Sequence, residues 1–406
     1  MIEAAVSSSR PLHVVQVVRS ASYGGVENHV YELCRHFLAQ GLRVDLVSLV
    51  DQEVRADFHE LGIRIFRLHD RMGWSPRSLT TTFELRKLLR TLAPDVVHLH
   101  GIRPTLVGPL SLLGSRSKGA PAVFATLHGA YSLMAIDYYG NVSRRLLLLA
   151  KAFHWIGFAL SDRVMVDCTT LVGEVRKVYR GLTWNFDRVA RRKVRVAHNG
   201  IDLQQFENMQ QHADIRQRLG CESGTVLIGS ISRLDEPKKG TGVLLRAARI
   251  VLDECPNARF VICGEGYSRA ELEALAAQLE IADRVVFLGF WKDALEVYRA
   301  LDVFVLPSLS EGFPTVNLEA MAAGLPVVTT DVGGAAEAVH EGTCGFVVPP
   351  NDAPALAAAM IRLCTDSALR STMGAHARKV VKESFGSDVT ARRVMDAYRE
   401  VVARSG

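Results

Sequence analysis

The sequence lacks the cysteine patterns of disulfide-rich or cysteine-zinc proteins. Its seven cysteines among 406 residues are scattered and odd in number, and none forms a Cys-x-x-Cys pair. Most lie in apolar runs, such as Cys263 in Phe260-Val-Ile-Cys263. We therefore expect buried thiols in a reducing compartment and neither a disulfide framework nor a zinc site.

Long uninterrupted apolar runs are also missing. The first ten residues are rich in serine and have no apolar core of a signal peptide. The longest apolar stretch, 146–160, is interrupted by Lys151 and His154 and is too short to cross a bilayer. No solenoid repeat or low-complexity tract is present either. We expect a cytoplasmic protein, or one bound at most to the inner face of a membrane.

The charge is small overall but uneven along the chain. The 48 basic and 43 acidic side chains give a formal net charge of +5, and 48% of the residues are hydrophobic, as in a globular protein. Residues 1–200 hold 27 basic and 16 acidic side chains, whereas residues 201–406 hold 21 and 27. A basic half indicates an anionic partner, and the length predicts two domains.

Apolar β-branched runs alternate with amphipathic stretches in the first half. Residues 12–18 form a dense β-branched run, 26–40 have helical periodicity, and 44–50 form a second apolar run. The pattern predicts a strand, a helix and a strand, with a glycine turn after the first strand. Further strands are predicted at 96–99 and 123–127.

The alternation restarts after Gly200-Ile-Asp202. Near-continuous apolar strands between helical patterns predict parallel sheets covered on both faces. The fold class is therefore α/β, with two doubly wound Rossmann-like domains facing each other across a cleft. The expected domains are 1–198 and 199–386, with a C-terminal helix at 387–406 that packs back toward the first domain. The strands of the second series are predicted at 226–229, 259–262, 285–288, 303–306 and 327–329.

Two glycine-containing or basic loops follow predicted strands, where ligands of open α/β sheets bind. Gly24 and Gly25 precede the first helix, and such a helix N-terminus favours a phosphate. A plain tight turn is the alternative, and no Gly-x-Gly-x-x-Gly motif supports a dinucleotide. Arg233 and Lys239-Gly240 lie in the loop after strand 226–229, where two cations can clamp a diphosphate. A solvated basic loop is the alternative there.

The most specific segment is Ser308-Leu-Ser-Glu-Gly-Phe-Pro-Thr-Val-Asn-Leu-Glu319, after strand 303–306. Glu311 and Glu319 are eight residues apart, a little over two helical turns, and the N–H groups between them point out of a helix N-terminus. Carboxylates beside such donors suit a polyhydroxylated ligand. A solvent-facing acidic residue and a capping glutamate would be the structural alternative.

Together these segments resemble the GT-B glycosyltransferases of family 4, the retaining "group 1" enzymes. The signature is the Glu-x7-Glu pair with the Arg…Lys-Gly element described above. The resemblance covers nearly the whole chain. Supporting segments are Gly24-Gly25, Asn199-Gly-Ile-Asp202, Gly264-Glu-Gly266 and Asp331-Val-Gly-Gly-Ala-Ala-Glu337.

The resemblance implies a role for each matching residue. Arg233 and Lys239 would bind the diphosphate of the donor and stabilise the departing nucleotide, and Glu319 would hold the ribose hydroxyls. Glu311 and the amides of Phe313, Thr315, Val316 and Asn317 would grip the transferred sugar. His128 would lie near that sugar, Gly264 and the two glycines 24 and 25 would line the donor site, and Gly289-Phe-Trp291 would contact the base.

The resemblance also implies a reaction without a cofactor. Retention normally suggests an enzyme nucleophile, but no carboxylate is reliably placed for that role in the family. The implied route is a front-face attack in which the leaving phosphate takes the acceptor proton. Because the sequence has no Asp-x-Asp motif, no metal is expected, and Arg233 and Lys239 would supply the positive charge.

Two further features allow more than one interpretation. His98-Leu-His100 ends a strand with both rings on one face, which permits a metal pair, but with no third ligand evident we favour hydrogen-bonded or acceptor-contacting histidines. Residues 141–195 hold 12 basic and 4 acidic side chains. Their basic flanks predict contact with an anionic membrane surface or a lipid diphosphate, although the leucine run within them fits an ordinary core helix. No nucleic-acid partner is expected.

The expected protein is a retaining, metal-independent glycosyltransferase of surface polysaccharide assembly. A UDP-sugar is the preferred donor and GDP-mannose the alternative, and the acceptor is a saccharide, preferably lipid-linked. The N-terminal domain would bind the acceptor and the C-terminal domain the donor. A nucleotide-sugar 2-epimerase and a catalytically idle sugar-nucleotide-binding module are the alternatives.

Overall fold

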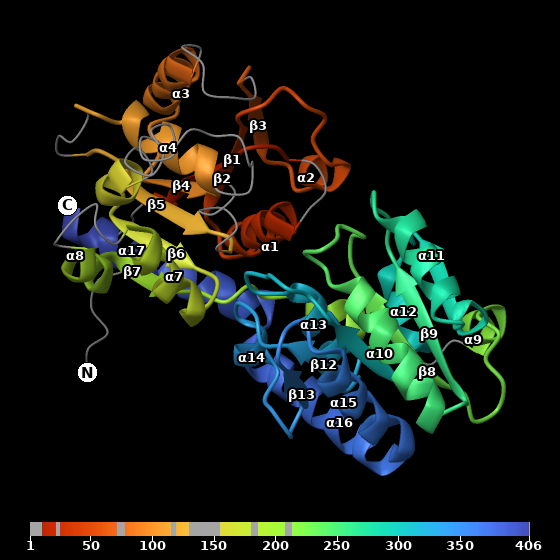
Figure 1. Ribbon diagram of the computed structural model, residues 1–406. Helices are drawn as coiled ribbons and strands as arrows, with labels where there is room; N and C mark the ends of the chain where they lie inside the picture. Colours follow the sequence, from red (N-terminus) through yellow and green to blue (C-terminus); the bar gives the residue numbers. More distant parts are fainter. Residues whose placement is uncertain are drawn as a thin grey trace, which may run out of the picture. The chain divides into compact units, whose positions relative to one another are not determined.

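Parallel strands alternating with helices make up both halves of the chain, as the sequence predicts (Figure 1). The computed structural model describes residues 10–21, 25–70, 78–114, 119–129, 155–179, 186–207 and 213–405. The chain forms two compact units, of which the first comprises residues 1–167, 172–198 and 387–406 and the second residues 168–171 and 199–386.

The first unit is built on a seven-stranded sheet in the order β3-β2-β1-β4-β5-β6-β7, with every pair parallel. Its strands are β1 (His13–Val18), β2 (Arg43–Ser48), β3 (Arg64–Arg67), β4 (Val96–His100), β5 (Ala122–Leu127), β6 (Arg163–Val166) and β7 (Val194–Val196). Its described helices are α1 (Gly25–Ala39), α2 (Ala56–Glu60), α3 (Ser78–Leu92), α4 (Ile102–Ser111), α7 (Thr169–Tyr179), α8 (Phe186–Lys193) and α17 (Ser387–Ser405). The first turn of α7 belongs to the second unit.

Side-chain alternation along the strands explains why helices cover both faces of this sheet. On β1, Val14 and Val18 join one apolar cluster with α1 and α17, whereas Val15 and Val17 join another with α3 and α4. Successive side chains of a strand point to opposite faces, so a strand of consecutive valines requires apolar cover on both sides. Tyr398 of α17 is fully buried in the first of these clusters.

The second unit contains a six-stranded parallel sheet in the order β10-β9-β8-β11-β12-β13. The strands are β8 (Val226–Ile231), β9 (Ala258–Cys263), β10 (Val285–Gly289), β11 (Val303–Leu306), β12 (Val327–Thr330) and β13 (Gly345–Val348). The helices are α9 (Ala213–Arg218), α10 (Thr241–Glu254), α11 (Arg269–Gln278), α12 (Ala294–Ala300), α13 (Thr315–Ala322), α14 (Ala335–Ala338), α15 (Ala353–Thr365) and α16 (Ser367–Ser384). Short 3₁₀ turns lie at η1 (Leu203–Phe206) and η2 (Ala282–Arg284).

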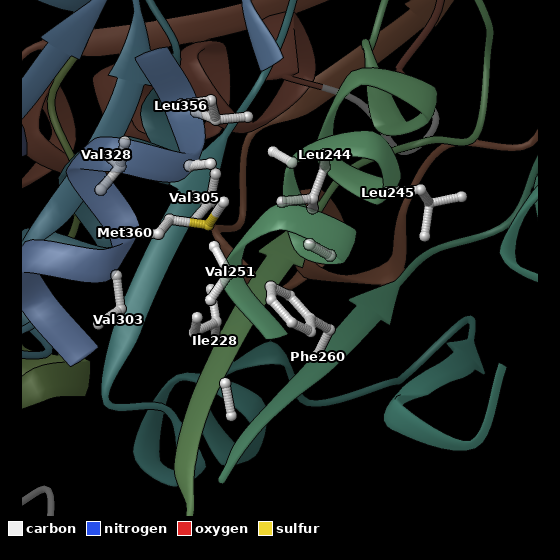
Figure 2. Packing of buried hydrophobic residues seen from close by; sticks show 14 of the residues in the cluster. Ile228, Leu244, Leu245, Val251, Phe260, Val303, Val305, Val328, Leu356 and Met360 are labelled. Carbon is white, nitrogen blue, oxygen red and sulfur yellow. The ribbon is translucent and has the colours of Figure 1, made fainter. Parts of the chain in front are cut away.

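The core of the second unit lies between its sheet and helices α10 and α15. Figure 2 shows strand residues such as Ile228 and Phe260 gathered with Val251 of α10 and Met360 of α15. All four side chains are at most 1% exposed. At about 1.5–3 kcal/mol for each fully buried large apolar side chain, this layer is a main source of the stability of the unit.

Each sheet reverses its strand order at one point, and that point locates the candidate site. In the first unit the order changes direction between β1 and β4, and in the second unit between β8 and β11. Loops that leave neighbouring strands in opposite directions open a crevice at the carboxyl ends of those strands, and ligands of this fold class bind there. The loops after β8 and β11 are the two that carry the predicted basic and acidic residues.

The sequence analysis missed strands β3, β6, β7 and β13. Each of the first three contains arginine, as in Arg64-Ile-Phe-Arg67, and has only three or four residues. Strand β13 begins with a glycine and is equally short. None of the helices in the described part of the chain combines the length and apolar character that a membrane span requires.

Candidate functional site

The loop after β8 and the loop after β11 pack backbone against backbone. Gly240 ends the first loop with φ +63°, and a Cβ at this position would lie 2.1 Å from the carbonyl oxygen of Pro307 in the second. The amide of Leu309 donates to the carbonyl oxygen of Lys238 over 2.8 Å. Only glycine fits this left-handed and crowded position, so Gly240 holds the two loops together.

Lys239 and Glu311, both predicted site residues, form an ion pair across these loops. Nζ of Lys239 donates to Oε1 of Glu311 over 2.7 Å, and the hydroxyl of Ser308 donates to the same oxygen over 2.7 Å. The two charged side chains are only 16% and 12% exposed. Burial also lowers the pKa of the neighbouring Lys238, and the charge of Glu311 raises that pKa in part. The pair is a shielded centre of opposite charges at the switch point of the sheet.

The glycines after β12 fix the Glu311 loop from its other side. Gly333 has φ +56°, and a Cβ there would lie 2.2 Å from the carbonyl oxygen of Gly312. The amide of Gly334 donates to the same carbonyl over 2.7 Å. Phe313 is 5% exposed and its ring lies 5.6 Å from that of Phe385. The loop that carries Glu311 is therefore held by backbone contacts rather than left to solvent.

Helix α13 begins directly after this loop, with Pro314 at its N-cap. The amides of Thr315 and Val316 lie in its first turn, where a helix provides no internal acceptor. The amide of Asn317 donates to Pro314 over 3.1 Å, and its fully buried side chain donates to the hydroxyl of Thr329 over 3.2 Å. Thr315 and Val316 are thus better placed to bind an anion or a hydroxyl than Asn317, whose amide has a partner within the helix.

Glu319 lies one turn further along α13 and is paired with a tyrosine that the sequence analysis missed. The buried hydroxyl of Tyr298 on α12 donates to Oε2 of Glu319 over 2.8 Å. Burial raises the pKa of Glu319, and this hydrogen bond lowers it in part. The pKa of Tyr298 rises well above its usual value, first through burial and then through the neighbouring carboxylate. Tyr298 therefore remains a neutral donor that orients Glu319.

Arg233 and Gly264 lie in neighbouring loops, where Arg233 offers an exposed charge and Gly264 allows close backbone packing. Arg233 is 73% exposed and pairs with Asp235 over 3.0 Å. Gly264 has φ +140°, and a Cβ there would lie 1.9 Å from the carbonyl oxygen of Ser232. Gly264 thus lets the loop after β9 approach the loop that carries Arg233, while the arginine side chain reaches into solvent.

Trp291 follows β10 at the edge of the sheet. Its indole Nε1 donates to Glu296 over 2.9 Å, and the guanidinium of Arg218 lies 5.4 Å from the ring centroid. These contacts fix the orientation of the ring.

The described site residues predicted in the first unit follow β1 and β5, on either side of β4. Gly24 lies outside the described residues, whereas Gly25 is exposed at the start of α1. His128 follows β5 and its Nε2 lies 3.3 Å from Nδ1 of His100 at the end of β4. His29 of α1, which the sequence analysis did not single out, packs edge-on against His128 with ring centroids 5.1 Å apart. The carboxyl edge of this sheet is thus lined with imidazoles.

Part of the basic stretch 141–195 falls outside the described residues, namely 141–154 and 180–185. Among its described cations, Arg188, Arg191 and Arg192 of α8 are exposed. Lys193 was expected to contact an anionic partner, but its Nζ is bound within the fold. It donates to the carbonyls of Ala159 and Ser161 over 2.5 and 2.7 Å.

Comparison with protein families assigns both halves of the chain. Residues 211–380 match the family described as "Glycosyl transferases group 1". Residues 23–205 match the family described as "Glycosyltransferase Family 4". Each matched range covers most of one structural unit.

Individual relatives agree over nearly the full length. The chain is 34% identical to a D-inositol 3-phosphate glycosyltransferase of Kribbella flavida over 410 residues, which cover 93% of this chain and 90% of the relative. It is 26% identical to the UDP-Gal:alpha-D-GlcNAc-diphosphoundecaprenol alpha-1,3-galactosyltransferase of Escherichia coli over 361 residues, which cover 88% and 87% of the two chains. A crystal structure of Anabaena HepE in complex with UDP-glucose superimposes with a TM-score of 0.77 at 20% identity, covering 96% of this chain and all of that one.

Proposed function

Because the chain belongs to the group 1 glycosyltransferases of family 4, with the GT-B fold, we propose that it is a retaining transferase of glycan biosynthesis. It moves a sugar from a nucleotide-diphosphate sugar to a saccharide acceptor. The observation that carries this proposal is the shielded Lys239–Glu311 pair at the switch point between β8 and β11.

Lys239 acts on the leaving group. In the transfer step the bond from the anomeric carbon to the diphosphate oxygen breaks, and the acceptor hydroxyl oxygen bonds to the same face of that carbon. The departing phosphate oxygen takes the hydroxyl proton. An ammonium held in a shielded site favours the charge that develops on this oxygen. Arg233, whose exposed side chain pairs with Asp235, turns to the diphosphate when the donor binds.

Glu311 and Glu319 divide the recognition of the donor between them. Glu311 accepts hydrogen bonds from hydroxyls of the transferred sugar, and the amides at the start of α13 donate to its oxygens. The hydroxyl of Ser308 keeps the Glu311 carboxylate in position. Glu319 accepts hydrogen bonds from the ribose hydroxyls, and Tyr298 orients it. The loop at Trp291 contacts the base, and His128 is the proposed histidine near the transferred sugar.

Replacing Tyr298 with phenylalanine is expected to weaken donor binding about tenfold and to leave the turnover number nearly unchanged. The substitution keeps the buried ring and removes only the hydroxyl that orients Glu319. A hydrogen bond to a charged group contributes about 1.5–3 kcal/mol, which sets the upper limit of the loss. Steady-state kinetics with varied donor separate KM from kcat. An equal loss in both, or in kcat alone, would contradict the positioning role.

A donor panel tests the proposed function directly. A UDP-sugar is the proposed donor and GDP-mannose the alternative, by analogy with the UDP-Gal-dependent relative of Escherichia coli. We expect one nucleotide sugar to raise the unfolding temperature and to be consumed only when a saccharide acceptor is present. Protection by no nucleotide sugar would overturn the proposal, and consumption of the donor by epimerisation without acceptor would replace it with a 2-epimerase.

The reaction is proposed to need no metal ion, because Lys239 and Arg233 supply the positive charge beside the diphosphate. Full turnover is therefore expected after exhaustive treatment with EDTA followed by assay in metal-free buffer. Loss of activity that only a divalent cation restores would contradict this assignment. The same assay with added Mg²⁺ serves as the reference.

A lipid-linked saccharide at an anionic membrane is the proposed acceptor, in line with the diphosphoundecaprenol-linked substrate in the name of the Escherichia coli relative. Arg191 and Arg192 on the exposed face of α8 are the proposed contacts. Replacing both with glutamine is expected to lower binding to vesicles with anionic lipid by about thirtyfold, at about 1 kcal/mol per cation. Vesicle co-sedimentation measures it, and Arg392→Gln plus Arg393→Gln on α17 is the control. Equal binding of wild type and the α8 variant would remove the membrane proposal.

A further inference from the structure

Three histidines of the first unit converge at the carboxyl edge of its sheet. His29 comes from α1, His100 ends β4, and His128 follows β5. One ring nitrogen of each lies within 4.8 Å of one from both others. In the described part of the chain, no other group of histidine, cysteine or acidic residues brings three ligand atoms together in this way.

Hydrogen bonds behind the cluster fix which nitrogen of His100 faces it. Nε2 of His100 lies 2.6 Å from Oε1 of Gln16, a fully buried amide oxygen that can only accept. The proton of His100 therefore sits on Nε2, and Nδ1 presents its lone pair to His128. This arrangement, a ligand whose second nitrogen donates to a buried oxygen, is typical of metal-binding histidines.

A second chain of hydrogen bonds holds Gln16 itself. Its Nε2 donates to the hydroxyl oxygen of Tyr398 over 3.5 Å, and that hydroxyl in turn donates to Nδ1 of His98, with 2.5 Å between oxygen and nitrogen. Nε2 of His98 then donates to the hydroxyl of Thr126 over 2.6 Å. Both nitrogens of His98 are used in this way, so His98 supports the cluster and does not belong to it.

The spacing of two of the three rings, those of His100 and His128, matches a tetrahedral metal ion. Nδ1 of His100 and Nε2 of His128 are 3.3 Å apart. Two imidazole nitrogens at about 2.0–2.1 Å from a tetrahedral zinc ion are about 3.3–3.4 Å apart. The ion would replace the hydrogen bond between His128 and His100. The proton of His128 would then lie on Nδ1 instead of Nε2, so no proton is released.

The chemistry of the donor set selects the class of metal. All three donors are imidazole nitrogens, which suit zinc, copper, nickel and cobalt, whereas magnesium and calcium require oxygen ligands. Burial lowers the pKa of His29 to about 4 and holds those of His100 and His128 well below the usual value. Burial thus disfavours the charged form of all three rings.

We propose that His29, His100 and His128 form a binding site for a divalent transition metal ion, represented by zinc, with one coordination position left open. Gln16 is its positioning residue. The three histidines belong to the first unit and the Lys239–Glu311 pair to the second, and the metal ion is not required for transfer. Because His128 is also assigned to the sugar site, an added consequence, which rests on the proposed function, is that zinc inhibits the transferase.

Metal binding is tested first without any activity assay. Untagged protein stripped with EDTA is titrated with Zn²⁺ by calorimetry and with Co²⁺ by visible absorption. We expect one ion per chain, a rise in unfolding temperature and the intense absorption of tetrahedral cobalt. His29→Gln and His128→Gln should each lower the affinity at least a hundredfold, with unchanged circular dichroism showing that the variants fold.

Two matched variants separate the site from general histidine chemistry. His69→Gln, which alters an exposed histidine of the same unit, should leave zinc binding unchanged. Gln16→Leu should lower zinc affinity tenfold to a hundredfold, and Gln16→Glu should restore it. Wild-type protein that binds no stoichiometric zinc, or cluster variants that bind zinc as wild type does, would overturn the proposal.

The inhibition arm is read as the ratio of turnover with and without zinc for each protein. We expect zinc to lower turnover of wild type at least tenfold, EDTA to restore it, and His29→Gln to be insensitive. Stoichiometric zinc binding without inhibition would support the metal site and show that zinc at His128 does not affect transfer. Absence of any transfer with all donors would instead count against the proposed function, because the binding measurements stand independently of it.

Discussion

Replacing Lys239 with alanine is expected to lower turnover about 10²- to 10³-fold while the protein remains folded. The ammonium is 2.7 Å from Glu311 in a position only 16% exposed, and alanine removes its positive charge from the leaving diphosphate. Loss of one preorganised group that stabilises transition-state charge typically costs this factor. Single-turnover kinetics at saturating donor report the chemical step directly.

Lys379→Ala is the matched control for this prediction. It removes the same charge from the same unit, at an exposed position on α16. It should retain wild-type turnover, and both variants should show wild-type circular dichroism. Wild-type turnover of Lys239→Ala would exclude Lys239 as the group that acts on the leaving phosphate. A loss confined to KM would reduce its role to donor binding.

The strands of the central sheets were predictable because their apolar runs are dense. Residues 226–229 and 303–306 appear within β8 and β11 almost as predicted, since Val, Ile and Leu at consecutive positions need cover on both faces. Edge strand β3, with two exposed arginines in four residues, carries no such signal. The missed strands are thus short ones, of three or four residues, whose apolar runs are broken or flanked by arginine or glycine.

The candidate site was predictable in its residues but not in its contacts. Lys239 and Glu311 are 72 positions apart, and only the adjacency of β8 and β11 in the sheet brings them together. Tyr298 reads in the sequence as one more core aromatic of a short helix. Its pairing with Glu319 follows from the packing of α12 near α13, which no local pattern encodes.

The histidines show the same limit for the first unit. Their pattern on β4 permitted a metal pair, although hydrogen-bonded or acceptor-contacting histidines were the favoured interpretation. The neighbours of His100 come from a helix after β1 and from the end of β5. His29 lies one turn into α1, and its direction toward the sheet edge depends on how that helix crosses β1. The long buried chain through Gln16 and Tyr398 spans 382 positions of sequence and is visible only in the folded chain.

Neutralising Glu311 is the second substitution with a large expected effect. Glu311→Gln keeps the size of the side chain and an acceptor for the hydroxyl of Ser308, but it removes the charge that pairs with Lys239. We expect a loss in turnover of about 10²-fold, because the lysine then loses its fixed position and the transferred sugar loses a charged acceptor. The same single-turnover measurement applies.

The double variant Lys239→Ala/Glu311→Gln decides whether the two residues act as one unit. Independent effects would multiply to a loss of about 10⁴-fold or more, whereas residues in direct contact give a double variant close to the worse single variant. The contact between Nζ and Oε1 leads us to expect the second result. Glu273→Gln, in an exposed pair with Arg269 on α11, is the control and should have no effect alone or with Lys239→Ala. Full multiplication of the two losses would show that Glu311 contributes through the sugar alone, and that its ion pair with Lys239 is not used in the reaction.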